Sequence, residues 1–115
     1  MLVTDLFKSW YEPLTEAEQE AVLRVVSALE MQGVNLGHPY STAIKTAKRY
    51  AIRELRTQHG RGAIRVLYAF DPNRDAVLLL GGFKRRENWY ADAVPKAEEE
   101  FRNYLLETKQ ESKQK

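Results

Sequence analysis

The chain has 115 residues, a formal net charge of +2, 43% hydrophobic residues and no cysteine. This length suits one domain with its own core, and the absence of cysteine excludes disulfides, thiolate metal sites and a cysteine nucleophile. No apolar run reaches the roughly 20 residues that span a bilayer, and the N-terminus lacks a basic segment followed by an apolar one. We therefore expect no membrane anchor and no signal peptide, and the missing cysteine is compatible with a cytoplasmic protein.

The first element is predicted in "LVTDLFKSWYEPL", residues 2–14. Val3, Asp5 and Phe7 alternate with Leu6 and Lys8, a period that is typical of a strand. The pattern predicts a strand that runs into a turn at Pro13.

A helix is predicted directly after it. "TEAE" has the form of a capping box, with Thr15 as the N-cap and Glu18 at the third helical position. Gly33 is a suitable end, because glycine tolerates the left-handed conformation. The apolar stripe expected to face the core consists of Val22, Val25, Val26 and Leu29.

The next segment is ambiguous. Residues 33–42, "GVNLGHPYST", are rich in turn formers and are expected to be a loop. Residues 43–58, "AIKTAKRYAIRELRTQ", are compatible with a short helix in one part and with a strand from Tyr50 to Thr57.

Two strands and a helix are predicted in the second half. "AIRVLYAF", residues 63–70, alternates cleanly, with Ile64, Val66, Tyr68 and Phe70 on one face and Arg65, Leu67 and Ala69 on the other. "HGRG" before it reads as a turn and "DPNRD" after it as a hairpin connection. "AVLLLGGF", residues 76–83, is apolar on both faces and is expected to lie inside the sheet.

From Asn88 onward the pattern is helical. Pro95 either opens the main helix or lies inside a helix that begins near Asn88. The residues expected on one side of this helix are Tyr90, Val94, Ala97, Phe101, Tyr104 and Leu105.

The expected fold is α+β: a small antiparallel sheet of three to four strands, packed with an N-terminal helical segment and a C-terminal helix. Residues 1–108 would form a single domain and residues 109–115 a polar tail.

The modest net charge conceals a basic middle. Between residues 45 and 65, Glu54 is the single acid, whereas seven residues are cationic: Lys45, Lys48, Arg49, Arg53, Arg56, Arg61 and Arg65. Lys84, Arg85 and Arg86 follow the last predicted strand. Such a distribution indicates either a solvated basic surface or a binding site for a polyanion.

Adjacent antiparallel strands would gather these charges at one end of the sheet. The end of the third strand then lies near the start of the second, so residues 84–86 approach Arg65, with Arg56 close to the intervening turn. Arg65 either points to solvent or belongs to a site. Glu54 and Arg56 share one face of any strand and either pair with a neighbouring strand or join that site. Phe83, Trp89 and Tyr90 flank the cations and would either stack on bases or pack on the helix.

Several common site types are absent from the sequence. No glycine-rich phosphate loop precedes a helix, and no serine lies in a nucleophile elbow. His38 and His59 have no carboxylate or cysteine partner at metal-ligand spacing. We expect neither a metal nor a cofactor.

In their order and spacing, four segments resemble the RelE/ParE superfamily of toxins from bacterial type II toxin–antitoxin pairs, in the HigB-like, phage Gp49-like branch. The segments are "LGHPYST", "IRELR", "RVLYAFDPNRDAVLLLGGFKR" and "KAEEEFRNYL", and the resemblance runs from about residue 7 to residue 106. It implies a small antiparallel sheet flanked by helices.

The resemblance also implies an activity, namely metal-independent cleavage of messenger RNA on the ribosome. A ribose 2′-hydroxyl attacks the adjacent phosphate, while basic side chains position the RNA and stabilise the transition state. By analogy, Arg65, Arg85 and Lys84 would act on the scissile phosphate. The residues expected to contact the rest of the RNA are Arg56, Arg86, Arg53, Phe83 and Trp89.

The sequence departs from the family at the general acid or base, because no residue after Arg86 maps onto the tyrosine or histidine of many members. Tyr90, His59 and Tyr104 are the candidates. The ParE side of the superfamily shares the fold but inhibits DNA gyrase, so a gyrase inhibitor or an inactive homologue that acts by binding is the alternative, with a non-toxic RNA-binding domain after it. The expected partner is an antitoxin, a helix-turn-helix DNA-binding protein.

Overall fold

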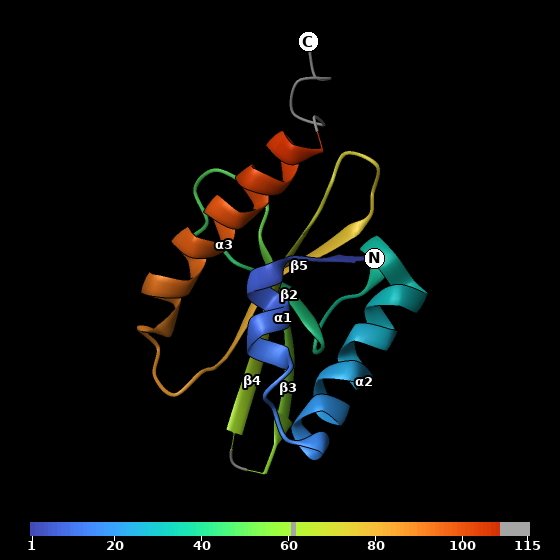
Figure 1. Ribbon diagram of the computed structural model, residues 1–115, viewed down its shortest axis with the longest axis vertical. Helices are drawn as coiled ribbons and strands as arrows, with labels where there is room; N and C mark the ends of the chain where they lie inside the picture. Colours follow the sequence, from blue (N-terminus) through green and yellow to red (C-terminus); the bar gives the residue numbers. More distant parts are fainter. Residues whose placement is uncertain (61, 109–115) are drawn as a thin grey trace.

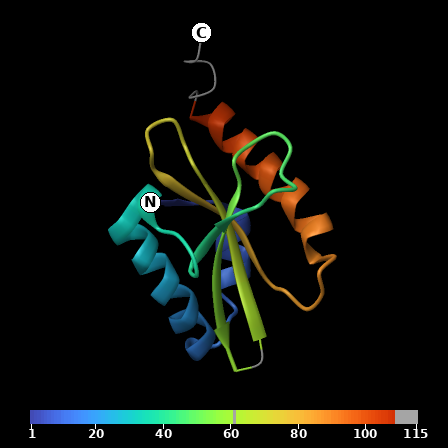
Figure 2. The ribbon, with the colours of Figure 1, turned by 180° about the vertical axis from the view of Figure 1, so that it is seen from behind.

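The computed structural model describes residues 1–60 and 62–108, and in it a β-sheet lies between two helical layers (Figures 1 and 2). The strands are β1 (Leu2–Val3), β2 (Ser41–Ala43), β3 (Arg53–His59), β4 (Gly62–Phe70) and β5 (Ala76–Phe83), and the helices are α1 (Asp5–Tyr11), α2 (Glu16–Gln32), the 3-10 turn η1 (Gly33–Asn35) and α3 (Trp89–Glu107). The sheet has five strands in the order β1-β5-β4-β3-β2. Every neighbouring pair is antiparallel except β1 and β5. The expected α+β class is confirmed, and the sheet has one strand more than the three to four expected, because β2 had not been predicted.

The prediction of a strand over residues 2–14 is wrong beyond Val3. Thr4 ends β1 and caps α1, because its hydroxyl oxygen accepts a hydrogen bond of 3.1 Å from the Phe7 N–H. The same hydroxyl donates to the carbonyl oxygen of Leu79 on β5 at 2.6 Å. Phe7, Trp10 and Tyr11 then follow at helical spacing, and the Phe7 ring contacts the rings of the other two. The alternation over residues 3–7 is too short to outweigh this cap and this apolar face.

The prediction for α2 is confirmed. The Thr15 hydroxyl accepts from the Glu18 N–H, and the Glu18 carboxylate accepts from the Thr15 N–H. Gly33 follows the helix with a φ of 55°, which disfavours other residues. The buried face of α2 consists of Ala21, Val22, Val25, Val26 and Leu29.

In the ambiguous middle segment the strand interpretation is correct and the short helix is wrong. β3 begins at Arg53 and pairs with β2, whose first two residues lie in the predicted loop. At three residues, β2 is too short to leave a periodic signal.

The two faces of β4 separate the core into two apolar layers, as its alternation predicted. Ile64, Val66 and Tyr68 pack against α1 and α2, whereas Leu67 and Ala69 pack against α3. β4 is the central strand, and β5 lies between β4 and β1. The predicted meander from β3 through β4 to β5 is therefore confirmed.

The C-terminal helix begins at Trp89 and contains Pro95, so the second of the two interpretations of Pro95 is correct. Its buried residues include Ala93, Val94, Ala97, Phe101 and Leu105. None of the helices described is both long and apolar enough to cross a membrane. Arg61 and the predicted tail, residues 109–115, lie outside the described part of the chain.

Candidate functional site

The strand register gathers charged side chains on the α3 face of the sheet. Arg56 of β3 is the register partner of Arg65 of β4, which is in turn opposite Gly82 of β5. Glu54 lies two residues from Arg56 and therefore points to the same face. The site begins where these strands lie side by side, near the turn between β3 and β4.

Glu54 is the centre of the polar network on this face. One carboxylate oxygen accepts a hydrogen bond of 2.6 Å from the Tyr90 hydroxyl, and the other accepts one of 3.1 Å from the Thr42 hydroxyl. The Arg65 Nε lies 3.3 Å from the first oxygen. Strands β2, β3 and β4 and helix α3 thus meet at one buried carboxylate.

Arg65 is buried rather than solvated, with only 7% of its surface exposed. Its Nη1 donates a hydrogen bond of 3.0 Å to the Ile64 carbonyl oxygen, while its Nε faces Glu54 as an ion pair without hydrogen-bond geometry. The interpretation of Arg65 as a solvent-facing residue is wrong. Because the guanidinium faces this carboxylate and the backbone, we interpret it mainly as the group that holds the Glu54 carboxylate in place.

Tyr90 is a proton donor in this arrangement. Burial, and then the hydrogen bond to Glu54, raise the pKa of its phenol above the ordinary value of 10.0, against a lowering influence of Arg65. At neutral pH the phenol is therefore protonated. Glu54 accepts the hydrogen bond from this phenol, so its carboxylate is the group of the pair that can accept a proton from a ligand.

A cleft of about 410 Å³ opens over this network. Glu54 and Tyr90 line it together with three cations, Lys45, Arg56 and Lys84. The Lys84 ammonium lies 5.3 Å from the centre of the Tyr90 ring. The three cations beside this carboxylate and phenol can bind a phosphodiester.

Lys84 is held by Glu87 in this structure. The Nζ–Oε1 distance is 2.8 Å, and this hydrogen bond and charge lower the pKa of the exposed Glu87 carboxyl. Glu87 also lines the cleft, so its carboxylate occupies the position beside Lys84 that a ligand phosphate would take.

Arg85 and His59 line a different cleft, of about 610 Å³, with Phe83 and Glu18. Successive residues of an extended chain point to opposite sides, which separates Arg85 from Lys84. Lys84 borders both clefts. Of the three cations after β5, the structure thus brings Lys84 to the Glu54 network and places Arg85 beside His59, while Arg86 is exposed.

Three further predicted site residues have packing or structural partners. The Arg53 Nε donates to the Ser41 and Tyr68 hydroxyls, on the other face of the sheet. Phe83 contacts the Trp10 ring edge-on, with the ring centres 6.2 Å apart. Trp89 lies directly over Gly82.

Tyr104 lies away from the Glu54 network. Its hydroxyl donates a hydrogen bond of 2.7 Å to Asp71, which follows the last residue of β4. Arg65 is near the other end of that strand, so we do not include Tyr104 in the candidate site.

Glu98 is a site-supporting residue that the sequence analysis missed. It is buried, and one of its carboxylate oxygens accepts from three successive backbone N–H groups, those of Lys48, Arg49 and Tyr50, at 2.5 to 3.0 Å. This fixes the loop that carries Lys45. A charged residue among Val94, Ala97 and Phe101 on the apolar face of α3 was the available signal.

Comparison with known proteins decides the family. The model of the family described as phage derived protein Gp49-like (DUF891) matches residues 9–102. The chain belongs to the Gp49-like family. The Mycobacterium tuberculosis protein named "Putative toxin HigB3" is 35% identical over 98 residues, which cover 84% of each chain. A second protein of that organism, named "Putative toxin HigB2", is 32% identical over 102 residues, 86% of this chain and 51% of the relative. No solved structure gave a significant match.

The Gp49-like match includes every residue of the Glu54 network and both clefts. Among the residues that the structure describes, no group of three or more histidine, aspartate or glutamate side chains is arranged to hold a metal ion.

Proposed function

We propose that the protein is the toxin of a type II toxin–antitoxin pair and cleaves messenger RNA on the ribosome, in the cytoplasm. The observation that carries the proposal is the cleft in which the Glu54 carboxylate and the Tyr90 phenol lie beneath Lys45, Arg56 and Lys84. Two relatives named as toxins, at 35% and 32% identity, support it.

The cleft suggests a role for each group. Arg56, Lys84 and Lys45 bind the scissile phosphate and stabilise the charge of its transition state. Glu54, held by Arg65, accepts the proton of the attacking ribose 2′-hydroxyl, and the oxygen then bonds to phosphorus as the 5′ oxygen leaves. Tyr90 orients Glu54, and its phenol would give its proton to the leaving 5′ oxygen and recover one from the protonated Glu54 through their hydrogen bond. No metal enters this scheme.

The second cleft would bind neighbouring nucleotides of the same strand. Arg85 and His59 line it, and Lys84 connects it to the first cleft. Arg85 and the exposed Arg86 contribute charge to the RNA backbone here rather than at the reacting phosphate.

The test is cleavage of messenger RNA by translating ribosomes, with the new 5′ ends mapped. We expect cuts with the unaltered protein and a loss of about 100-fold in rate with Lys84→Gln or Arg56→Gln. Arg85→Gln removes the same charge from the neighbouring cleft and should weaken binding more than it slows cutting. If Arg85→Gln and Lys84→Gln lost the same rate, the reacting phosphate would have to lie at the boundary between the two clefts rather than over Glu54.

Glu54→Gln tests the proton acceptor. It should abolish cutting in protein that is still folded, which circular dichroism checks, and Thr42→Val removes one hydrogen bond to Glu54 as a milder control. Intact messenger at high protein concentration, together with inhibited DNA supercoiling, would instead establish a gyrase inhibitor.

The proposed partner is an antitoxin. A basic cleft is inhibited most directly by an acidic segment that covers it. Co-expression with the product of the neighbouring gene should restore growth to cells that express this chain, and continued arrest would contradict the pairing.

A further inference from the structure

The edge of β5 is only partly covered by another strand. In the described part of the chain, β1 pairs with Val77 and Leu78 and reaches no further. Thr4 extends the contact through its hydrogen bonds to the Leu78 and Leu79 carbonyl oxygens. Beyond Leu79, none of the described strands lies beside this edge.

The pairing with β4 shows which backbone groups remain open there. The Lys84 N–H donates to the Ala63 carbonyl oxygen at 2.8 Å, and the pairing of β5 with β4 is regular from Leu80 to Phe83. In an antiparallel pair, backbone groups point alternately toward and away from the partner strand. Gly81 and Phe83 therefore direct their N–H and C=O groups outward.

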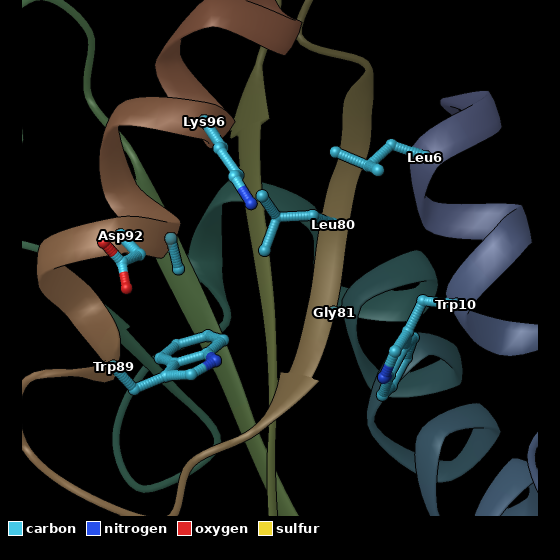
Figure 3. A pocket seen from close by; sticks show the side chains of 8 residues that line it. Leu6, Trp10, Leu80, Gly81, Trp89, Asp92 and Lys96 are labelled. Atoms are coloured by element: carbon cyan, nitrogen blue, oxygen red, sulfur yellow. The ribbon is translucent and has the colours of Figure 1, made fainter.

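This open edge forms the floor of a cleft of about 180 Å³ between two helices. Figure 3 shows Leu6 and Trp10 of α1 on one side, Trp89 and Lys96 of α3 on the other, and β5 between them. The walls are largely apolar and the floor offers unpaired backbone groups, the combination that an extended peptide requires.

The two glycines of β5 shape this cleft. A Cβ atom on Gly81 would lie 2.3 Å from the Trp10 ring, and one on Gly82 would lie 2.8 Å from the Trp89 ring. Each indole can therefore lie directly against the strand, one on each face of the sheet. The chain's two tryptophans thus flank the open part of the edge.

Charge indicates what kind of peptide would bind. Lys96 lines the cleft and is exposed, and the open edge runs into the exposed Arg85 and Arg86. The acid that lines the cleft is Asp92, and Glu87 is already paired with Lys84. The surroundings of the open edge are therefore net cationic.

We propose that the open edge of β5 binds an extended, acidic peptide segment of a partner protein by β-strand addition. The segment pairs with Gly81 and Phe83, inserts an apolar side chain between Trp10 and Trp89, and places acids near Lys96 and Arg85. This surface goes beyond the RNA site proposed above, whose reacting groups lie over Glu54.

The probe is a synthetic nine-residue peptide that alternates valine with aspartate, titrated against the full chain. We expect a change in tryptophan fluorescence and slower hydrogen exchange at the Gly81 and Phe83 amides. A peptide of the same sequence with N-methyl groups on the bonding edge cannot donate those hydrogen bonds and should lose both effects. Equal binding of the methylated peptide would overturn the strand-addition proposal.

Charge reversal supplies the matched variants. Lys96→Glu should weaken the acidic peptide about fivefold. Lys8→Glu makes the same change at an exposed position of α1 that does not line the cleft, and should have no effect. Failure of the peptide to protect Gly81 and Phe83 would overturn the proposal. So would protection of these amides by self-association without peptide, or by single-stranded RNA in preference to peptide. Messenger cleavage is measured separately, so failure here leaves the proposed reaction untouched.

Discussion

Arg56 and Arg65 lie directly opposite each other on β3 and β4, two cations in register on one face of a sheet. Like charges in this position destabilise a sheet, and Glu54 offsets only the buried member of the pair through its ion pair with Arg65. The exposed Arg56 has no such partner among the described ion pairs, so it remains available to a ligand.

Arg56→Gln should therefore stabilise the fold while it impairs cleavage. Removing the repulsion is expected to raise the free energy of unfolding by about 0.5 kcal/mol, measured by urea denaturation. Arg24→Gln, at an exposed position of α2, is the control and should change neither stability nor cleavage. A loss of stability in Arg56→Gln would show that its guanidinium supports the sheet.

Tyr90 should make stability fall at high pH. Since its pKa is raised in the folded state, its contribution is complete below about pH 10, the unfolded value, and is lost as pH rises through the higher folded value. Tyr90→Phe should cost about 1 kcal/mol at neutral pH through the lost hydrogen bond to Glu54. Urea unfolding from pH 8 to 11 should show this difference shrinking only above pH 10. A difference that already shrinks at pH 8 would contradict the direction of the shift.

Glu87 should compete with RNA for Lys84. Glu87→Gln removes the anion that pairs with this lysine, and we expect RNA to bind about threefold more tightly at low salt. Glu99→Gln is the matched control, because Glu99 forms an ion pair of the same spacing with Arg102 on α3. Filter binding with a non-cleavable RNA measures both variants, and equal affinities would argue against a phosphate at Lys84.

Glu98 should control the loop that carries Lys45. Glu98→Ala leaves three backbone N–H groups without their acceptor and is expected to cost about 3 kcal/mol, whereas Glu98→Gln keeps an acceptor oxygen and should cost less. Hydrogen exchange at the Lys48, Arg49 and Tyr50 amides should quicken in both variants, and more in Glu98→Ala than in Glu98→Gln. Glu99→Ala, at the exposed neighbouring position, should leave these amides unchanged.

The parts of the fold that the sequence predicted have long, repeated patterns. The faces of β4 followed from its alternation, and α2 followed from its capping box and apolar stripe. α1 was missed because seven residues give two helical turns, and the alternation around Asp5 imitates a strand. β2 was missed because it is shorter than any detectable period and exists because β3 offers hydrogen bonds. β1 is the part of the predicted first strand that pairs with β5.

The approach of residue 84 to the start of β4 was predicted from strand order, since a meander brings these two segments together. The sequence could not predict which side chains of the site are buried. Arg65 is buried beside Glu54, which accepts a hydrogen bond from Tyr90 of α3, and no sequence period shows that α3 docks at this point. The separation of Arg85 from Lys84 was available in principle from the alternation of an extended chain.

The division of the core by β4 has a consequence for unfolding. The layers under α2 and α3 lie on opposite faces of the sheet, yet both are built from alternate residues of the same strand. Loss of either layer would expose one side of β4 and remove the support on which the other layer packs. The two helical layers should therefore melt in a single cooperative transition, with probes on α2 and α3 reporting the same midpoint.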